Sequence, residues 1–312
     1  MKVAVCITTY KRPEGLRRLL SGLDMLSFEG GAPPSLSVVV VDNDEAETAA
    51  AVCEEVRGWF KWPLEYHVEP RRGISQARNR AVACAVALGA DFLAFVDDDE
   101  VPEPSWLDQL LSVQRTHAAD VVGGPVFPYF YEPVPDWVIE GKFFEQPFER
   151  PRYRTGHLLK LTAAGNVLVR TSLFAEMSEY FDEELGLTGG EDTLFFAHAY
   201  EAGYKLVWAD EAVAHEWTPR SRTNARWILK RSYRLGNAAS LCEARESAGW
   251  TVRAVRIAKG CGRVGQGLLL FLPSIPLSLI VGRQAIMRAL VLVCRGAGML
   301  AGVLKIRHEE YR

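Results

Sequence analysis

The first 115 residues alternate between short, continuously apolar runs and longer segments in which apolar residues recur every three or four positions. Continuous apolar runs at 3–7, 36–42 and 91–97 are typical of strands that are buried on both faces, as in parallel sheets. A fourth run, at 64–68, has the β-branched and aromatic composition of a strand. The sequence therefore predicts four strands in this part of the chain.

The segments between these runs have helical signals. Pro13 suits the first turn of a helix, and the leucines behind it fall at i, i+3, i+4 and i+7, namely Leu16, Leu19, Leu20 and Leu23. Further helices are predicted at 46–57, from Ser75 as N-cap to Leu88 with Gly89 at its end, and at 106–115. This order favours an α/β fold with a doubly wound, mostly parallel sheet, whose ligands bind at the carboxyl ends of the strands.

Polar clusters follow three of the predicted strands. Thr8-Thr9-Tyr10 follows the first strand, Asp42-Asn43-Asp44 the second, and Asp97 to Glu100 the fourth. Carboxylates so close together repel one another, and a divalent cation is the simplest means of holding them at a strand end. A solvated acidic turn before Pro102 is the alternative. Three polar clusters at equivalent strand ends favour a binding site.

Other ligand motifs do not occur in the chain. No G-x-G-x-x-G follows the first strand and no G-x-x-x-x-G-K-[ST] is present, so neither phosphate-binding turn is available. The segment from Asp42 begins like a calcium loop but has Glu47 where the turn glycine belongs. No two of the six cysteines are spaced as C-x-x-C, which favours a reducing compartment without disulfides or structural zinc.

The net charge of −3 conceals an uneven distribution. Residues 251–312 contain ten Lys and Arg residues and two Glu residues, a local charge of +8, whereas residues 1–250 carry −11. We expect no nucleic-acid partner for this acidic body. The basic, apolar C-terminal segment indicates an anionic surface as its partner.

Six motifs occur in order along the chain: CITTYKRPEGL, VVVVDND, RRGISQARNRA, FVDDDEVPEP, GNVLV and GGEDTLFF. In this spacing they resemble inverting family 2 glycosyltransferases with the GT-A fold, and more closely the succinoglycan-type exopolysaccharide glucosyltransferases of bacteria. The resemblance covers about residues 3–234 and implies a catalytic domain at 1–235. It also implies a UDP-sugar donor, most simply UDP-glucose, and a divalent cation, Mn²⁺ or Mg²⁺.

The resemblance assigns roles to the polar clusters. Asp99 would bind the metal across the diphosphate, Asp97 would share the metal and lie near the ribose, and Asp42 would bond the uracil ring. His215 would complete the metal shell, with a structural histidine as the alternative; whether Asp98 binds the metal stays open. The residues expected to contact the nucleotide sugar are Thr8, Thr9, Tyr10, Asp42, Arg78, Asp97, Asp98, Gly165, Asn166, Gly190, Arg220 and Arg222.

An inverting displacement needs one carboxylate that takes the proton of the acceptor hydroxyl as it attacks. The resemblance identifies Asp192 as this base and Glu191 as its neighbour in contact with acceptor or donor. A helix start is the structural alternative, since acidic groups favour the positive end of the helix dipole.

The C-terminal segment, expected at 236–312, is helical, basic and apolar. Residues 264–282 carry no charge over 19 positions, near the length that spans hydrocarbon, but Pro273 and Pro276 are expected to interrupt them. Arg288 and Arg295 lie seven apart on one face of a second amphipathic helix. We expect a re-entrant or interfacial anchor in preference to a full span. The alternatives are packing on the catalytic domain and homodimerisation.

The expected function is transfer of one sugar to a saccharide acceptor, lipid-linked, at the cytoplasmic side of a bacterial inner membrane. Processive synthases of the family carry Q-x-x-R-W, whereas Thr223 here stands at the glutamine position before Arg226-Trp227, which favours a single transfer. A sugar-1-phosphate nucleotidyltransferase of similar fold and a non-catalytic sugar-nucleotide-binding protein are the alternatives.

Overall fold

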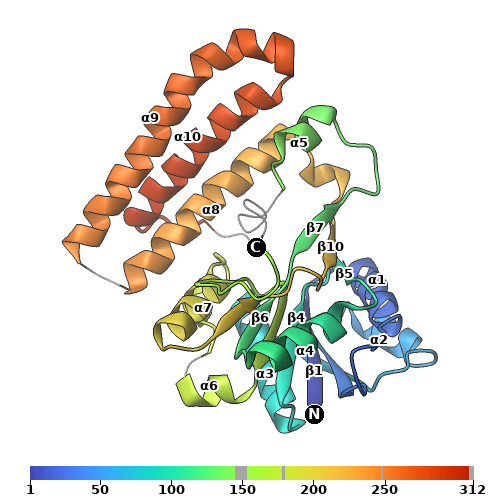
Figure 1. Ribbon diagram of the computed structural model, residues 1–312. Coiled ribbons are helices and arrows are strands. Elements are labelled where there is room, and N and C mark those ends of the chain that lie inside the picture. Colours follow the sequence, from blue (N-terminus) through green and yellow to red (C-terminus); the bar gives the residue numbers. More distant parts are fainter. Residues whose placement is uncertain (145–152, 178–179, 247–248, 309–312) are drawn as a thin grey trace. The chain divides into compact units, whose positions relative to one another are not determined.

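The computed structural model describes residues 1–144, 153–177, 180–246 and 249–308 (Figure 1). The chain divides into two compact units. The first combines residues 1–129, 146–187 and 191–217, and the second combines residues 130–145, 188–190 and 218–312.

Within the described residues, a seven-stranded sheet forms the centre of the first unit. Its strands are β1 (Lys2–Thr9), β2 (Ser35–Asp42), β3 (Leu64–Val68), β4 (Phe92–Val96), β6 (Val121–Gly123), β8 (Asn166–Arg170) and β9 (Leu206–Trp208). Their order is β3-β2-β1-β4-β8-β6-β9, and β3, β2, β1 and β4 are mutually parallel, whereas β8 is antiparallel to its neighbours β4 and β6. The predicted strands and the mostly parallel sheet are confirmed.

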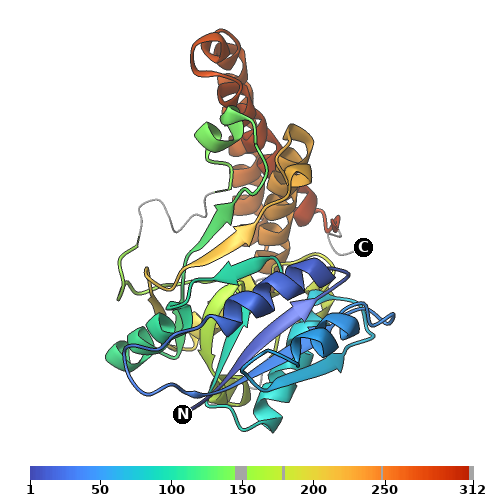
Figure 2. The same cartoon turned by 90° about the vertical axis from the view of Figure 1, so that its right-hand side faces the viewer.

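Helices cover both faces of this sheet (Figures 1 and 2). On one face lie α1 (Pro13–Asp24), α2 (Ala50–Val56) and α4 (Trp106–His117), and on the other lie α3 (Ile74–Ala87), α6 (Ser172–Met177) and α7 (Glu191–Glu201). Val38 and Val40 of β2 enter the first core, while Val39 and Val41 enter the second. A continuous apolar run is needed because both faces of the strand are buried.

Two of the predicted helix starts are displaced. Helix α2 begins at Ala50 and not at 46, because Glu47 adopts a left-handed conformation with a φ of 52°. Helix α3 begins at Ile74, and the prediction that Ser75 caps it was wrong. The Ser75 hydroxyl instead donates to the carbonyl oxygen of Asp182 at 2.7 Å, which ties α3 to the short helix η1 (Glu183–Leu185).

A small second sheet lies beside the acidic segment. It contains β5 (Glu100–Pro102), β10 (Ala214–Trp217) and β7 (Val126–Tyr129), in the order β5-β10-β7. Glu216 of β10 pairs with Glu100 of β5, and His215 pairs with Val101. Neighbouring residues of a strand point to opposite faces, so Glu216 and His215 face different sides of this sheet.

The second unit is helical. Its elements are α5 (Asp136–Gly141), η2 (Arg220–Arg222), α8 (Ala225–Glu246), α9 (Trp250–Val281) and α10 (Gln284–Val303). Val138, Phe144, Ile228 and Met287 form a common apolar cluster that joins α5, α8 and α10. The boundary expected after residue 235 lies inside α8.

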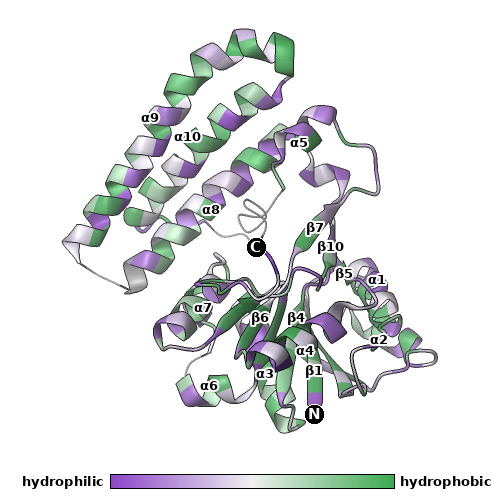
Figure 3. Cartoon of the chain, viewed as in Figure 1, coloured by the Kyte–Doolittle hydropathy of each residue, from purple (hydrophilic) through white to green (hydrophobic). Residues whose placement is uncertain are grey.

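Helix α9 continues through Pro273 and Pro276, so the predicted interruption was wrong. Each proline removes only its own N–H from the helical ladder, and the neighbouring Ser274 and Ser278 hydroxyls donate to the carbonyls of Phe271 and Ile275. By length and composition, α9 and α10 could each cross a membrane. Figure 3 shows the apolar residues concentrated toward the C-terminal half of α9.

Candidate functional site

The three predicted polar clusters meet at one edge of the sheet. Strand β1 lies between β2 and β4, and its residue Thr9 stands beside Asp42 in the parallel register. Asp97 directly follows β4. Because the carboxyl ends of these three strands are adjacent, the expectation of one shared crevice edge agrees with the structure.

The acidic turn after β4 is held by groups from the end of β1. The Thr9 hydroxyl donates to Asp98 Oδ2 at 2.8 Å, and Arg12 Nη1 lies 2.9 Å from both Asp98 Oδ1 and Asp99 Oδ2. Burial raises the pKa of Asp98 to about 6, although Arg12 opposes this shift. Both oxygens of Asp98 therefore have partners within the protein, and this carboxylate anchors the turn.

Asp97 and Glu100 crowd around Gly165. A Cβ at Gly165 would come within 2.6 Å of Glu100 Oε1 and 3.3 Å of Asp97 Oδ2, so a larger residue here would collide with the carboxylates. Desolvation, with repulsion from neighbouring carboxylates, raises the pKa of Asp97 and raises that of Glu100 well above its ordinary value. Glu216 adds to this repulsion at Glu100. The turn concentrates negative charge where a cation would relieve it.

The donor chemistry of this turn fits a hard divalent cation. Asp97 and Asp99 supply carboxylate oxygens, and Mg²⁺ is commonly held by one or two carboxylates together with substrate phosphates. Among the residues that the structure describes, no group of three or more His, Cys, Asp or Glu side chains has a metal-holding arrangement. A site of two aspartates would therefore need oxygens from a phosphate ligand and water to be complete.

His215 is not brought to this pair of aspartates. Its Nε2 lies 3.0 Å from Glu103 Oε1 and its ring packs beside Phe127, on the face of β10 opposite Glu216. His215 was expected to complete the metal shell, but in the structure its side chain contacts Glu103 and Phe127 of the surrounding fold instead. Glu216 is the residue of β10 whose charge reaches the acidic turn.

Arg78 joins the acidic turn to the start of α7. Its guanidinium donates to Glu191 Oε1 through Nη1 and to Asp97 Oδ1 at 3.2 Å through Nη2. Burial raises the pKa of Glu191 to about 7, with Arg78 opposing the shift. Arg78 and Glu191 are almost fully buried, and Glu191 Oε2 has no hydrogen-bond partner among the described residues. The expected proximity of Arg78 to acidic residues agrees with this geometry.

We predict that Arg78→Met lowers the free energy of unfolding by ~3–5 kcal/mol, because the substitution leaves the Glu191 carboxylate buried without its counter-charge. The double variant Arg78→Met/Glu191→Gln should recover part of this loss, since position 191 then carries no charge and only Asp97 loses a partner. Urea denaturation of the two single variants and the double variant measures the coupling. Equal losses for Arg78→Met with and without Glu191→Gln would contradict the assigned pair.

Asp192 lies at the start of α7, half-buried, with a different set of partners. Its Oδ1 accepts from the Thr193 N–H at 2.6 Å, and its Oδ2 accepts from the Ala164 N–H at 3.1 Å. These bonds fix the carboxylate near Gly165, and its charge contributes to the raised pKa values of Asp97 and Glu191. The structure thus places this carboxylate at the acidic cluster.

Two residues that were expected to contact the nucleotide sugar make hydrogen bonds within the protein. Asn166 accepts from Trp106 Nε1 at 2.7 Å and donates to the carbonyls of Pro125 and Ala212, so all of its amide is engaged in a buried network. Asp42 has no exposed surface and accepts from the N–H groups of Asp44 and Ala49 and from the Tyr66 hydroxyl. Both side chains thus have partners within the protein, and their expected contacts with a nucleotide sugar stay predictions.

The sequence motif did not identify Asp44 as a candidate site residue. Its Oδ2 is buried and has no hydrogen-bond partner within the described chain, while its Oδ1 lies 4.0 Å from Lys11 Nζ. Nearby, the Arg72 guanidinium lies 4.0 Å from the centre of the Tyr10 ring. The sequence could not identify this carboxylate, because only the folded chain shows that one oxygen of Asp44 is buried without a hydrogen-bond partner.

The remaining predicted contact residues are divided between the two units. Thr8 is nearly buried at the end of β1. Gly190, with a φ of 98°, and Arg220 and Arg222 of η2 belong to the second unit, so their expected contacts with a nucleotide sugar stay predictions.

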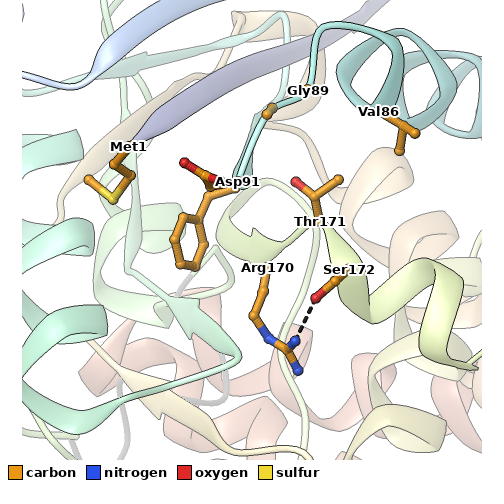
Figure 4. Close-up of a pocket in the computed structure, with 9 residues that line it drawn as sticks. Met1, Val86, Gly89, Asp91, Arg170, Thr171 and Ser172 are labelled. Atoms are coloured by element: carbon orange, nitrogen blue, oxygen red, sulfur yellow. Dashed lines mark hydrogen bonds between the residues drawn. The ribbon is translucent and has the colours of Figure 1, made fainter.

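A cavity of about 550 Å³ lies at the opposite ends of the strands (Figure 4). Met1, Asp91 and Arg170 line it, and they precede β1, precede β4 and end β8 respectively. The cavity is therefore remote from Asp97 along β4 and does not belong to the acidic site.

Comparison with known proteins decides the family. Residues 4–178, more than half of the chain, match the family described as Glycosyl transferase family 2. The chain belongs to glycosyl transferase family 2. This family 2 chain is 34% identical over 238 residues to the succinoglycan biosynthesis protein ExoM of Rhizobium meliloti (strain 1021), covering 76% of this chain and 73% of that protein. The predicted family is confirmed.

Solved structures of low identity share the fold of this family 2 protein. Staphylococcus aureus TarS 1–349 in complex with UDP-GlcNAc has a TM-score of 0.55 at 19% identity, covering 94% of this chain and 90% of that one. The mannosyltransferase PcManGT from Pyrobaculum calidifontis, in complex with GDP-Man and Mn²⁺, has a TM-score of 0.65 at 15% identity, covering 97% and 87%. The expected GT-A fold is confirmed.

Proposed function

We propose that this glycosyltransferase transfers a single sugar, glucose, from a UDP-sugar to a lipid-linked saccharide with inversion, in exopolysaccharide biosynthesis. The observation that carries the chemistry is the meeting of Asp97, Asp99 and Asp192 at one sheet edge. The similarity to the succinoglycan biosynthesis protein ExoM supports a role in exopolysaccharide biosynthesis, and the UDP-GlcNAc complex of TarS supports a nucleotide-diphosphate sugar as the donor.

Asp97 and Asp99 are the residues proposed to hold a divalent cation, Mn²⁺ or Mg²⁺. When bound, this cation would neutralise the charge that develops on the UDP leaving group. Asp98 does not need to take part, because Thr9 and Arg12 already occupy its oxygens. Arg12 contacts Asp99 as well, so it positions this carboxylate before any ligand arrives.

Asp192 is proposed to take the proton from the acceptor hydroxyl. Its bonds to the Ala164 and Thr193 N–H groups fix the carboxylate while leaving it half-exposed. A carboxylate held in this way can take a proton from a hydroxyl that is placed beside it, as a general base does. Glu191 is buried against Arg78, so we assign it to holding this edge of the site together.

The membrane part of the proposal rests on the second unit. Two helices apolar enough to cross a membrane agree with an acceptor that is anchored in lipid. We place the protein at the cytoplasmic side of a bacterial inner membrane, where nucleotide sugars are available.

A donor screen tests the nucleotide assignment. Binding of UDP-, GDP- and dTDP-sugars, measured by calorimetry with and without Mn²⁺, should show metal-dependent affinity for UDP-glucose above the others. Tighter binding of a GDP- or dTDP-sugar would contradict the proposed donor, and equal binding with and without metal would contradict the cation.

A further inference from the structure

Helix α10 lies between α8 and α9 within the second unit (Figure 1). Glycines make these contacts close: Gly267 of α9 faces the backbone of Ala289, Gly298 of α10 faces Tyr233, and Gly302 faces Asn237. The residue pairs show that α8 runs parallel to α10 and that α9 returns antiparallel. Helix α9 is therefore the outermost helix of the three and has a neighbour on one side.

The residues of α9 that are buried form a single stripe, namely Arg256, Gly260, Gly267 and Ser274. Spacings of four and seven residues keep such a stripe on one helix face. The opposite face carries the most exposed apolar side chains of the helix's uncharged half: Leu269 at 79%, Leu272 at 72%, Leu279 at 88% and Ile280 at 82%. This face, the outer face of α9, is apolar and uncovered.

The charge around the outer face is of one sign. Residues 249–308 contain nine Lys and Arg residues and no Asp or Glu. Arg283 is exposed at the C-terminal end of the uncharged run, and Arg253 and Lys259 are exposed on the N-terminal half of α9, whereas Arg263 is half-buried. An apolar face flanked by exposed cations is complementary to the surface of an anionic bilayer, whose acyl boundary takes the leucines and whose headgroups take the cations.

A full crossing by α9 conflicts with its neighbours in the same unit. Ile228 of α8 packs in one cluster with Met287, close to the turn between α9 and α10. Exposed Arg226 and Lys230 of α8 therefore lie level with the uncharged half of α9. At the turn itself, Gln284 Nε2 donates to Glu140 Oε2 of α5. A bilayer spanned by α9 would enclose these charged groups, which is strongly unfavourable.

We propose that α9 lies in the plane of an anionic bilayer surface, with its outer face buried in one leaflet and Arg283 at the headgroups of that leaflet. The helix does not span the membrane. This inference rests on the membrane association proposed above and deepens it by giving its orientation. It depends on the second unit alone, so its tests need no sugar donor and can fail or succeed independently of transfer.

Vesicle flotation tests the outer face. We expect the full chain to float with vesicles of phosphatidylglycerol and phosphatidylcholine. Leu272→Glu/Leu279→Glu should weaken this partitioning at least ~10-fold, because two leucines no longer enter the leaflet. The control is Leu158→Glu, which makes one such change at an exposed leucine of the first unit and should bind like the unaltered chain.

Unchanged partitioning of Leu272→Glu/Leu279→Glu would overturn the proposal. So would light scattering that shows a dimer of the unaltered chain split into monomers by this variant while vesicle binding persists, since the outer face would then join two copies.

Labelling from each side of the membrane tests the orientation. In a chain with Cys261→Ala and Cys294→Ala, the substitution Arg283→Cys provides an exposed thiol at the turn. A membrane-impermeant maleimide should label it in inverted inner-membrane vesicles and not in right-side-out vesicles, because the turn stays at the cytoplasmic leaflet. Labelling from the opposite side, or none in inverted vesicles, would overturn the in-plane orientation.

Discussion

Asp192→Asn should lower sugar transfer by ~10²–10⁴-fold, the usual range for loss of a general base, while donor binding stays unchanged. The amide can still accept a hydrogen bond at the start of α7, but it cannot take the proton of the acceptor hydroxyl. An Asn amide keeps only one of the two backbone bonds that Asp192 accepts, so the thermal unfolding temperature should fall modestly. Initial rates of UDP release in the presence of acceptor, with calorimetric affinity for the donor, measure the two effects separately.

The same substitution distinguishes the base from a purely structural acid at a helix start. A structural Asp192 would lower transfer only in step with stability, whereas a base lowers transfer far more than the loss of one backbone bond can explain. If Asp192→Asn transfers sugar at close to the unaltered rate, the proton is taken by another group.

Asp99→Asn should weaken metal-dependent binding of UDP by at least ~10–100-fold, a range that even loss of a supporting group around a metal produces. The amide removes the charge that a divalent cation needs and leaves UDP binding without metal little changed. Calorimetric titration with UDP in the presence and absence of Mn²⁺ gives both affinities.

Asp120→Asn provides the matched control for Asp99→Asn. Asp120 also pairs with an arginine, at 2.8 Å from Arg170 Nη2, but this pair lies beside the cavity of Figure 4 and not at the acidic turn. The control should leave the metal dependence unchanged. Equal metal-dependent affinity for Asp99→Asn and the unaltered chain would show that Asp99 does not hold the cation.

Much of the first unit could be predicted because its signals are local. Apolar runs such as 36–42 must be buried on both faces, and the spacing of Leu16, Leu19 and Leu23 fixes one face of α1. The convergence of Thr9, Asp42 and Asp97 follows from parallel neighbouring strands, which share one carboxyl edge. Strand order and the antiparallel β8 depend on long-range pairing, which periodicity does not record.

The partners of three candidate residues could not be predicted, and for a common reason. Asp42, Asn166 and His215 each occur in a motif with the right residue type, but long-range partners decide what the side chain does. Tyr66 lies 24 positions from Asp42, Trp106 lies 60 from Asn166, and Glu103 lies 112 from His215. A motif shows that a polar group is present at a strand end and leaves its direction undetermined.

The continuity of α9 could not be read from Pro273 and Pro276 alone. A proline usually ends a helix in water, where the freed carbonyl is solvated and the chain can turn. Here the helix continues through both prolines, and the Ser274 and Ser278 hydroxyls bond to the carbonyls of Phe271 and Ile275 in the preceding turn. The outer face of α9 likewise depends on which side α10 covers.

The most direct test of the central claim follows the reaction of UDP-glucose labelled at the anomeric carbon with a lipid-linked saccharide by NMR. We predict equal amounts of UDP and of a single β-linked product, formed only with a divalent cation and almost absent for Asp192→Asn. An α-linked product would contradict inversion. Release of glucose 1-phosphate on addition of pyrophosphate would indicate a nucleotidyltransferase, and binding without any turnover would contradict an enzyme that transfers sugar.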